Sequence, residues 1–148
     1  MYFIESSAFV KLFVAELGSQ HMVRLVESSE DASRMASSLA LVEVRSAIRR
    51  RQRSGEIREV DADAALSALD SEWRRLIDHP VTSAVIGHSL ALIDRRYLRA
   101  LDALQLASAI AARDSMVKHV ALTFVCSDER LLAAAQAEGL AVWNPETA

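Results

Sequence analysis

The sequence predicts an α/β fold in which a short parallel sheet of four to five strands lies between two layers of helices. Short apolar runs alternate along the chain with longer segments of helical periodicity. No two runs are joined by the tight turn that marks a β-hairpin. Strands separated by helices pair in parallel and bury both faces of their sheet. The 148 residues contain no linker or repeat, so we expect one domain over residues 1–148.

The chain opens with the first predicted strand. An aromatic and β-branched run at residues 2–4 is too short for a helix. Ser6 and Ser7 then offer a helix N-cap, and apolar residues recur at helical spacing up to Gly18. A second helix is predicted over residues 20–28.

The middle of the chain predicts one strand and two helices. Residues 35–36 suit a short strand, and the serine pair 37–38 offers the N-cap of a helix that Gly55 ends. Asp61 is expected to cap a further helix that reaches Leu76.

The last part of the chain alternates helix and strand most clearly. Helices are predicted over residues 82–95 and 100–112, the second rich in alanine and leucine. The continuous apolar run 120–125 is typical of a central parallel strand. A helix over 128–139, capped by its first residue, then leads to a last strand at 140–143.

Composition narrows the classes of function. A net charge of −3 argues against a large basic surface for nucleic acid, so any such contact is expected to be local or to use a bound cation. The single cysteine, Cys126, cannot form an internal disulfide. The N-terminus has no signal-peptide pattern, and no apolar run could span a membrane. We therefore expect a soluble cytoplasmic protein.

Four acidic residues are expected to meet at one edge of the sheet. Glu5 ends the first strand, Asp128 follows the strand at 120–125, and Glu43 lies early in the helix after the second strand. Asp102 lies in an apolar run, where an unpaired carboxylate is costly. Ligands of open parallel sheets bind at the carboxyl ends of the strands.

The four acids together predict a metal site. Taken singly, three of them have an ordinary interpretation: a helix cap for Asp128, a surface residue for Glu43, and a buried pair with Arg99 for Asp102. Glu5 is harder to explain in this way, because a carboxylate that ends a buried strand needs a partner. Gathered at one edge, they would repel each other unless a cation neutralised them. Carboxylate oxygens suit Mg²⁺ or Mn²⁺. Such a site can activate water against a phosphodiester without a covalent nucleophile.

Four segments resemble the motifs of PIN-domain nucleases, especially the VapC toxin ribonucleases of toxin–antitoxin systems. The segments are, in order, IESSAFVKL at 4–12, LVEV at 41–44, LRALDALQLA at 98–107 and FVCSDERLL at 124–132. The third is the most distinctive, and the order and spacing match over nearly the whole chain.

The resemblance implies a PIN-like α/β/α domain and a Mg²⁺- or Mn²⁺-dependent endoribonuclease toxin. Glu43, Asp102 and Asp128 would be metal-site carboxylates, and Ser6 or Ser7 would form hydrogen bonds near the metal. The substrate would be RNA. The resemblance also implies a homodimer and a cognate antitoxin protein that blocks the site.

Glu5 departs from the motif, which has aspartate at this position. The extra methylene displaces the carboxylate by about 1.5 Å, and Mg²⁺ demands near-ideal geometry. We expect that Glu5 folds back or the ion moves, which weakens metal binding and turnover. The alternative function is a catalytically silent PIN module that binds RNA or a protein partner.

Two groups of arginines are candidates for contact with RNA. Arg45, Arg49 and Arg50 belong to a dense basic cluster that suits a solvated helix end, an RNA contact, or a dimer or antitoxin interface. Arg95, Arg96 and Arg99 precede Asp102 and could meet the substrate, and Arg99 is expected to support the site. A phosphoacceptor signalling domain also gathers acids at strand ends. That fold needs adjacent acids after the first strand and a lysine after the last, and this chain has neither.

Overall fold

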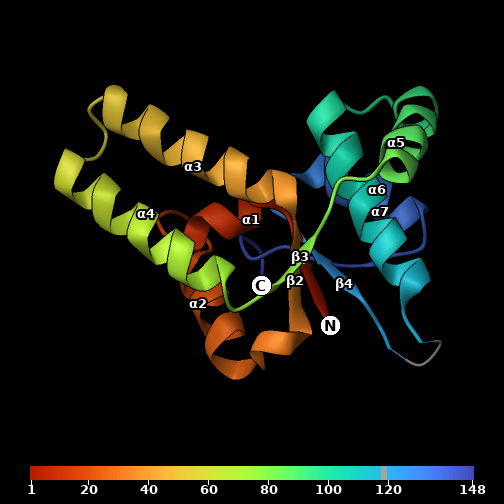
Figure 1. Ribbon diagram of the computed structural model, residues 1–148, viewed down its shortest axis with the longest axis horizontal. Coiled ribbons are helices and arrows are strands. Elements are labelled where there is room, and N and C mark those ends of the chain that lie inside the picture. The colour runs from red at the N-terminus through yellow and green to blue at the C-terminus, as the bar shows by residue number, and fades with distance from the viewer. Residues whose placement is uncertain (118–119) are drawn as a thin grey trace.

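A computed structural model describes residues 1–117 and 120–148 and confirms the α/β prediction. One sheet holds five parallel strands in the order β3-β2-β1-β4-β5 (Figure 1). The strands are β1 Tyr2–Ile4, β2 Arg34–Ser37, β3 Ile77–His79, β4 Thr123–Val125 and β5 Ala141–Trp143.

Helices cover both faces of the sheet. The α-helices are α1 Ser6–Phe9, α2 Ser19–Ser28, α3 Ser38–Arg53, α4 Glu59–Trp73, α5 Ser83–Arg96, α6 Ala100–Ser115 and α7 Glu129–Ala137. Two 3₁₀ turns are η1 Val10–Leu12 and η2 Asp31–Ser33. Helices α1 to α4 lie on one side of the sheet and α5 to α7 on the other (Figure 1). No helix among the described residues is long and apolar enough to cross a membrane.

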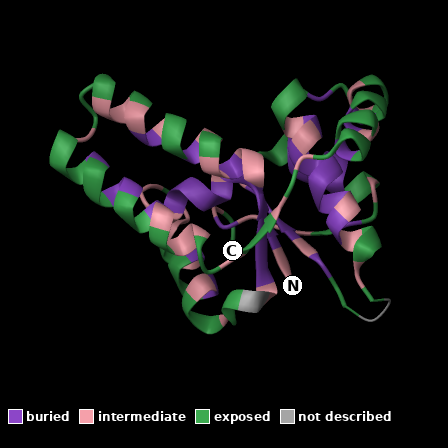
Figure 2. Cartoon of the chain, viewed as in Figure 1, coloured by how far each residue is buried: buried purple, intermediate pink, exposed green. Residues whose placement is uncertain are grey.

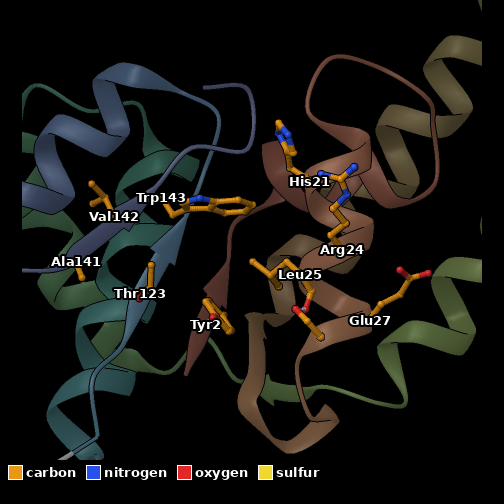
Figure 3. Close-up of a pocket in the computed structure, with 10 residues that line it drawn as sticks. Tyr2, His21, Arg24, Leu25, Glu27, Thr123, Ala141, Val142 and Trp143 are labelled. Atoms are coloured by element: carbon orange, nitrogen blue, oxygen red, sulfur yellow. Dashed lines mark hydrogen bonds between the residues drawn. The ribbon is translucent and has the colours of Figure 1, made fainter. Parts of the chain in front are cut away.

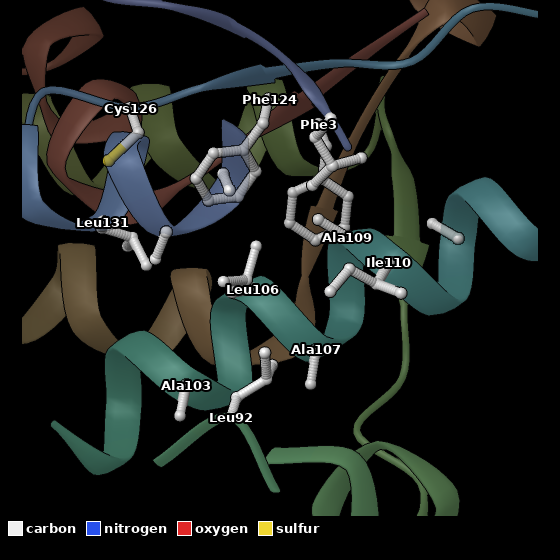
Figure 4. Packing of buried hydrophobic residues seen from close by; sticks show 14 of the residues in the cluster. Phe3, Leu92, Ala103, Leu106, Ala107, Ala109, Ile110, Phe124, Cys126 and Leu131 are labelled. Carbon is white, nitrogen blue, oxygen red and sulfur yellow. The ribbon is translucent and has the colours of Figure 1, made fainter. Parts of the chain in front are cut away.

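Alternation along the short strands supplies both halves of the core. Phe3 and Phe124 face α6, where their rings stack at a centroid distance of 6.0 Å against Leu106 (Figure 4). Ile4 and Val125, one position further along, belong to the cluster under α1 to α4. Strands β1, β2 and β4 are mostly buried at the centre of the molecule, whereas the outer faces of the helices are exposed (Figure 2).

The prediction for the first helix was wrong in its cap and its length. The helix is capped by Glu5, whose carboxylate accepts from Ser7 N, and not by the serines. It ends at Phe9 and tightens into the 3₁₀ turn η1, which places Lys11 inside the protein. There Lys11 Nζ donates to Glu16 and Glu146, an ion cluster that apolar periodicity could not indicate.

Three boundaries in the rest of the chain also differ from prediction. Strand β3 was not foreseen because Ile77–His79 is an edge strand with exposed and polar residues. Only Thr123–Val125 of the apolar run is a strand, and its neighbour β1 occupies the centre of the sheet. Helix α4 begins at Glu59, since Arg58 is its N-cap and Asp61 lies in its first turn.

Candidate active site

The carboxyl edge of the sheet brings the predicted acids into one region. Glu5 directly follows β1, and Asp128 follows the adjacent β4 and caps α7 by accepting from Leu131 N at 3.0 Å. Ser37 caps α3 in the same way, so that this helix leaves the edge carrying Glu43. Asp102 lies in the first turn of α6.

Two cavities at this edge contain the four acids. A cleft of about 590 Å³ is lined by Glu5, Glu43 and Asp102, together with both serines of α1. A smaller cavity of about 110 Å³ is lined by Asp102 and Asp128. Asp102 and Arg99 line both, so the two cavities are adjacent and are treated as one candidate site.

Glu5 is buried and turned back onto the start of α1. Its side chain is enclosed, with the residue 5% exposed. Oε1 lies 2.7 Å from the Ser6 hydroxyl, while Oε2 accepts from Ser7 N at 2.8 Å and from the Ser7 hydroxyl. Burial raises the pKa of Glu5, and the hydrogen bonds of Ser7 and Ser6 offset only part of that effect. The longer side chain is thus accommodated by folding back.

Ser6 joins Glu5 to Glu43. Its hydroxyl oxygen lies 2.7 Å from Glu43 Oε2 and also 2.7 Å from Glu5 Oε1. A hydroxyl has one proton to donate, so one of the two carboxyl groups must supply the other proton. Burial raises the pKa of Glu5, which favours Glu5 as the group that keeps its proton.

Asp102 lies in an excess of negative charge. Its pKa is raised first by burial and then by the charges of Asp128 and Glu43. Arg99 and Arg130 act in the opposite direction without reversing the shift. A cation bound between these acids would relieve the repulsion.

The donor chemistry of the site fits a divalent cation, although the side chains are not gathered around one. Within residues 1–117 and 120–148, no three His, Cys, Asp or Glu side chains lie close enough to hold a metal ion. The available donors are hard carboxylate oxygens, which Mg²⁺ and Mn²⁺ prefer. Gln105 Oε1 is a further oxygen that is buried with no hydrogen-bond partner. Binding would require small rotations of the acidic side chains.

Four of the arginines suggested for RNA contact lie elsewhere. Arg45 and Arg49 on α3 pair with Asp70 and Asp63 of α4 at 2.6 and 3.0 Å. Arg95 and Arg96 both pair with a single acid of the α7 end, Glu138 Oε2 and Oε1, at 2.7 and 2.8 Å. None of these four arginines is among the residues that line the two cavities.

Two residues of the site were missed: Arg130 lines the smaller cavity, and Gln105 contacts Glu43. Of the basic cluster on α3, Arg50 does line the cleft. Helical spacing could have found Gln105, which lies three positions after Asp102 and hence on the same face of α6. Arg99, expected in support, does line both cavities.

Cys126 has a structural role beside the site. Its thiol is buried, burial raises its pKa, and it receives a hydrogen bond from Asp128 N at 3.3 Å. A thiol whose pKa is raised is a poor nucleophile.

A larger cavity of about 770 Å³ opens between α2 and the strands. Tyr2 and Trp143 form its sheet side, and His21, Arg24 and Leu25 form its α2 side (Figure 3). It contains none of the four predicted acids. This cavity is larger than the cleft, but the acids that could bind a cation line the cleft at the carboxyl edge of the sheet.

Comparison with known proteins settles the family. No family model matches the chain. Ribonucleases VapC45 and VapC49 from two strains of Mycobacterium tuberculosis are each 31% identical over 142 residues, which covers 96% of this chain and 94% of each relative. The chain belongs to the VapC ribonuclease family. This result agrees with the resemblance carried by the four motifs.

Solved structures show that the fold is that of VapC and related toxins. PAE2754 from Pyrobaculum aerophilum matches with a TM-score of 0.71 at 20% identity, over 99% of this chain and 90% of that one. A toxin–antitoxin complex from Klebsiella pneumoniae matches at 0.67 and 14% identity, over 98% of both chains. VapC20 of M. tuberculosis, a sarcin-ricin loop cleaving toxin, matches at 0.66 and 18% identity, over 95% and 96%.

Proposed function

We propose that this VapC-family chain is a divalent-metal-dependent endoribonuclease toxin of the cytoplasm, restrained by a cognate antitoxin and slowed by Glu5. One observation carries the proposal: Glu43, Asp102 and Asp128 gather at the carboxyl edge of the sheet, and none of them takes part in an ion pair found within residues 1–117 and 120–148. Acids left without a cationic side chain are available to a metal.

Asp102, Glu43 and Asp128 would hold Mg²⁺ or Mn²⁺, which when bound supplies an activated water and neutralises charge at a phosphodiester. The chain's own residues orient the reaction. Arg50 and Arg99 lie at the cleft and can attract the phosphate backbone of RNA. Glu43 and Asp102 are both partly exposed, so an unpaired RNA segment can reach them.

Loss of Asp102 is the direct test of the proposal. Purified chain, free of antitoxin, should cleave RNA with Mg²⁺ or Mn²⁺ and stop when the metal is chelated. Asp102→Asn should reduce the rate by more than about 100-fold, because it removes a ligand and even supporting residues contribute 10- to 100-fold. Asp94→Asn, a change at an exposed acid of α5, is the matched control. Equal metal-dependent cleavage by wild type and Asp102→Asn would refute the assignment.

The alternative is a silent module that binds RNA or a protein partner. The surroundings of Glu5 favour it, because both oxygens of this buried carboxyl group are engaged in hydrogen bonds with Ser6 and Ser7. Glu5→Asp separates the two functions. A large gain in cleavage supports a competent nuclease limited by Glu5, whereas no cleavage by either form supports the silent module.

The proposed partners are an antitoxin and a second copy of the chain. The similarity to the toxin–antitoxin complex from Klebsiella pneumoniae and to the VapC ribonucleases supports an antitoxin. For the homodimer, α5 presents Ile86 and Leu90 on one side, 48% and 59% exposed. Light scattering of Leu90→Glu should report a monomer where the wild type reports a dimer.

A further inference from the structure

We infer that Gln105 is a positioning residue: a hydrogen bond from its buried amide holds the Glu43 carboxylate in place at the cleft. The inference rests on the proposed function of that cleft. Gln105 is 1% exposed, on the side of α6 that bears Asp102. It is a long polar side chain enclosed in an apolar core, a placement that requires compensating hydrogen bonds.

Both amide protons of Gln105 point to the site. Nε2 donates to Glu43 Oε2 at 2.6 Å and to the Ser6 hydroxyl at 3.1 Å. The acceptors come from α3 and α1, so this one amide joins three helices around the cleft. The Glu43 carboxylate fixes this orientation of the amide, because an amide oxygen turned toward it would bring two hydrogen-bond acceptors of negative partial charge together.

The amide also keeps one oxygen of Glu43 occupied. Oε2 accepts from Gln105 and Ser6, whereas no hydrogen bond among the described residues involves Oε1 of Glu43. The carboxylate is therefore anchored by one oxygen, with the other available for an incoming ligand. A carboxylate anchored in this way loses less conformational freedom on binding a cation, and removal of such supporting contacts commonly lowers metal affinity 10- to 100-fold.

The experiment compares Gln105→Met with the wild type and with Ser89→Ala. Methionine keeps the length of glutamine and removes the donor. Ser89→Ala removes a buried hydroxyl of α5, remote from the acids, which donates only to Ile86 O. Mn²⁺ affinity of each protein is measured by electron paramagnetic resonance without RNA. RNA cleavage is then measured at rising Mn²⁺ concentration.

We expect Gln105→Met to bind Mn²⁺ about 10- to 100-fold more weakly and to regain much of its cleavage at saturating Mn²⁺, while Ser89→Ala behaves as wild type. Unchanged affinity in Gln105→Met would overturn the positioning role. A wild type that neither binds Mn²⁺ nor cleaves RNA would instead overturn the proposed function, and the positioning role with it.

A second measurement separates positioning from packing. The pair Glu43→Gln and Gln105→Glu exchanges donor and acceptor. In chelator, each single change should lower the free energy of unfolding, and the double change should restore most of it without restoring cleavage. Additive losses in the double-mutant cycle would mean that the two side chains do not interact, and would also overturn the positioning role.

Discussion

Acids of the scaffold and acids of the cleft have opposite surroundings. In the scaffold, Glu138 receives two arginines, which hold its pKa at about 2. In the cleft, burial and two neighbouring acids raise the pKa of Asp102. Glu16 belongs to the first group: burial opposes ionisation, yet Arg51 and Lys11 outweigh it and lower its pKa. Acids of the scaffold are thus paired with arginine or lysine side chains of the same chain. The cleft acids form no such ion pairs among the described residues.

The largest effect on the free energy of unfolding is expected when a buried arginine of the scaffold is removed. Arg34 is fully buried and pairs with Glu72, whose side chain is 12% exposed. Arg34→Met should lower the free energy of unfolding by about 3 kcal/mol, because it leaves a buried carboxylate without its main partner. Arg99→Met, in the cleft, should change it by less than about 0.5 kcal/mol.

Chemical denaturation measures both variants. The double change Arg34→Met with Glu72→Met should recover most of the loss, since replacing a whole buried ion pair by apolar side chains is nearly neutral. Equal effects of the Arg34 and Arg99 substitutions would erase the contrast between scaffold and cleft.

Glu5 predicts a pH dependence of the opposite sign to that of the scaffold acids. Its pKa is raised above the ordinary 4.5 in the folded chain, so the folded state binds more protons than the unfolded state above that pH. In metal-free buffer its contribution to stability should fall as the pH rises from 4.5 through the folded pKa. Glu5→Gln removes that loss, so its free energy of unfolding should rise relative to that of the wild type between pH 4 and pH 7. A constant difference in stability across that range would contradict a raised pKa of the buried Glu5.

A smaller effect on stability is expected for Glu138 at acidic pH. Its folded pKa of about 2 lies below the ordinary 4.5, so its stabilisation is present above pH 4.5 and is lost as the pH falls toward 2. Glu138→Gln should lower stability at pH 7 by about 1 kcal/mol, since Arg95 is partly solvent-exposed and the pair is screened. The two proteins should converge near pH 2, which acid titration of thermal unfolding can follow.

Much of the site could be predicted from sequence because its acids lie in local motifs. Asp102 and Asp128 begin helices at strand or loop ends, and such positions are visible in the pattern of caps and apolar runs. Contacts between distant segments could not be foreseen. Arg95 and Arg96 meet Glu138 across 43 and 42 residues, which removes them from the cleft.

The conformation of Glu5 illustrates the same limit. Sequence comparison identified the extra methylene, and simple geometry gave two options, a folded-back side chain or a displaced ion. Only the placement of both serines decides between them, because their donors capture the carboxyl group. Likewise, the short and polar strand β3 depends on pairing with β2 and has little signal of its own.

The smallest effect is expected on RNA affinity when a single arginine of the cleft is removed. Arg50 lines the cleft, whereas Arg45 is paired with Asp70 outside it. In an Asp102→Asn background, Arg50→Ala should weaken RNA binding several-fold and reduce the salt slope by about 1, as loss of one phosphate contact does. Arg45→Ala should leave both nearly unchanged. Filter binding at several salt concentrations measures this, and the reverse ranking would place the RNA on the outer face of α3.

The central claim is that the acids of the cleft bind a divalent cation. A crystal of the wild-type chain soaked in Mn²⁺ and measured at the manganese absorption edge tests it most directly. The account predicts an anomalous peak in contact with Asp102 and with Glu43 or Asp128, whose side chains turn to meet the ion. No peak in the cleft at saturating Mn²⁺, with these acids placed as they are without metal, would contradict it.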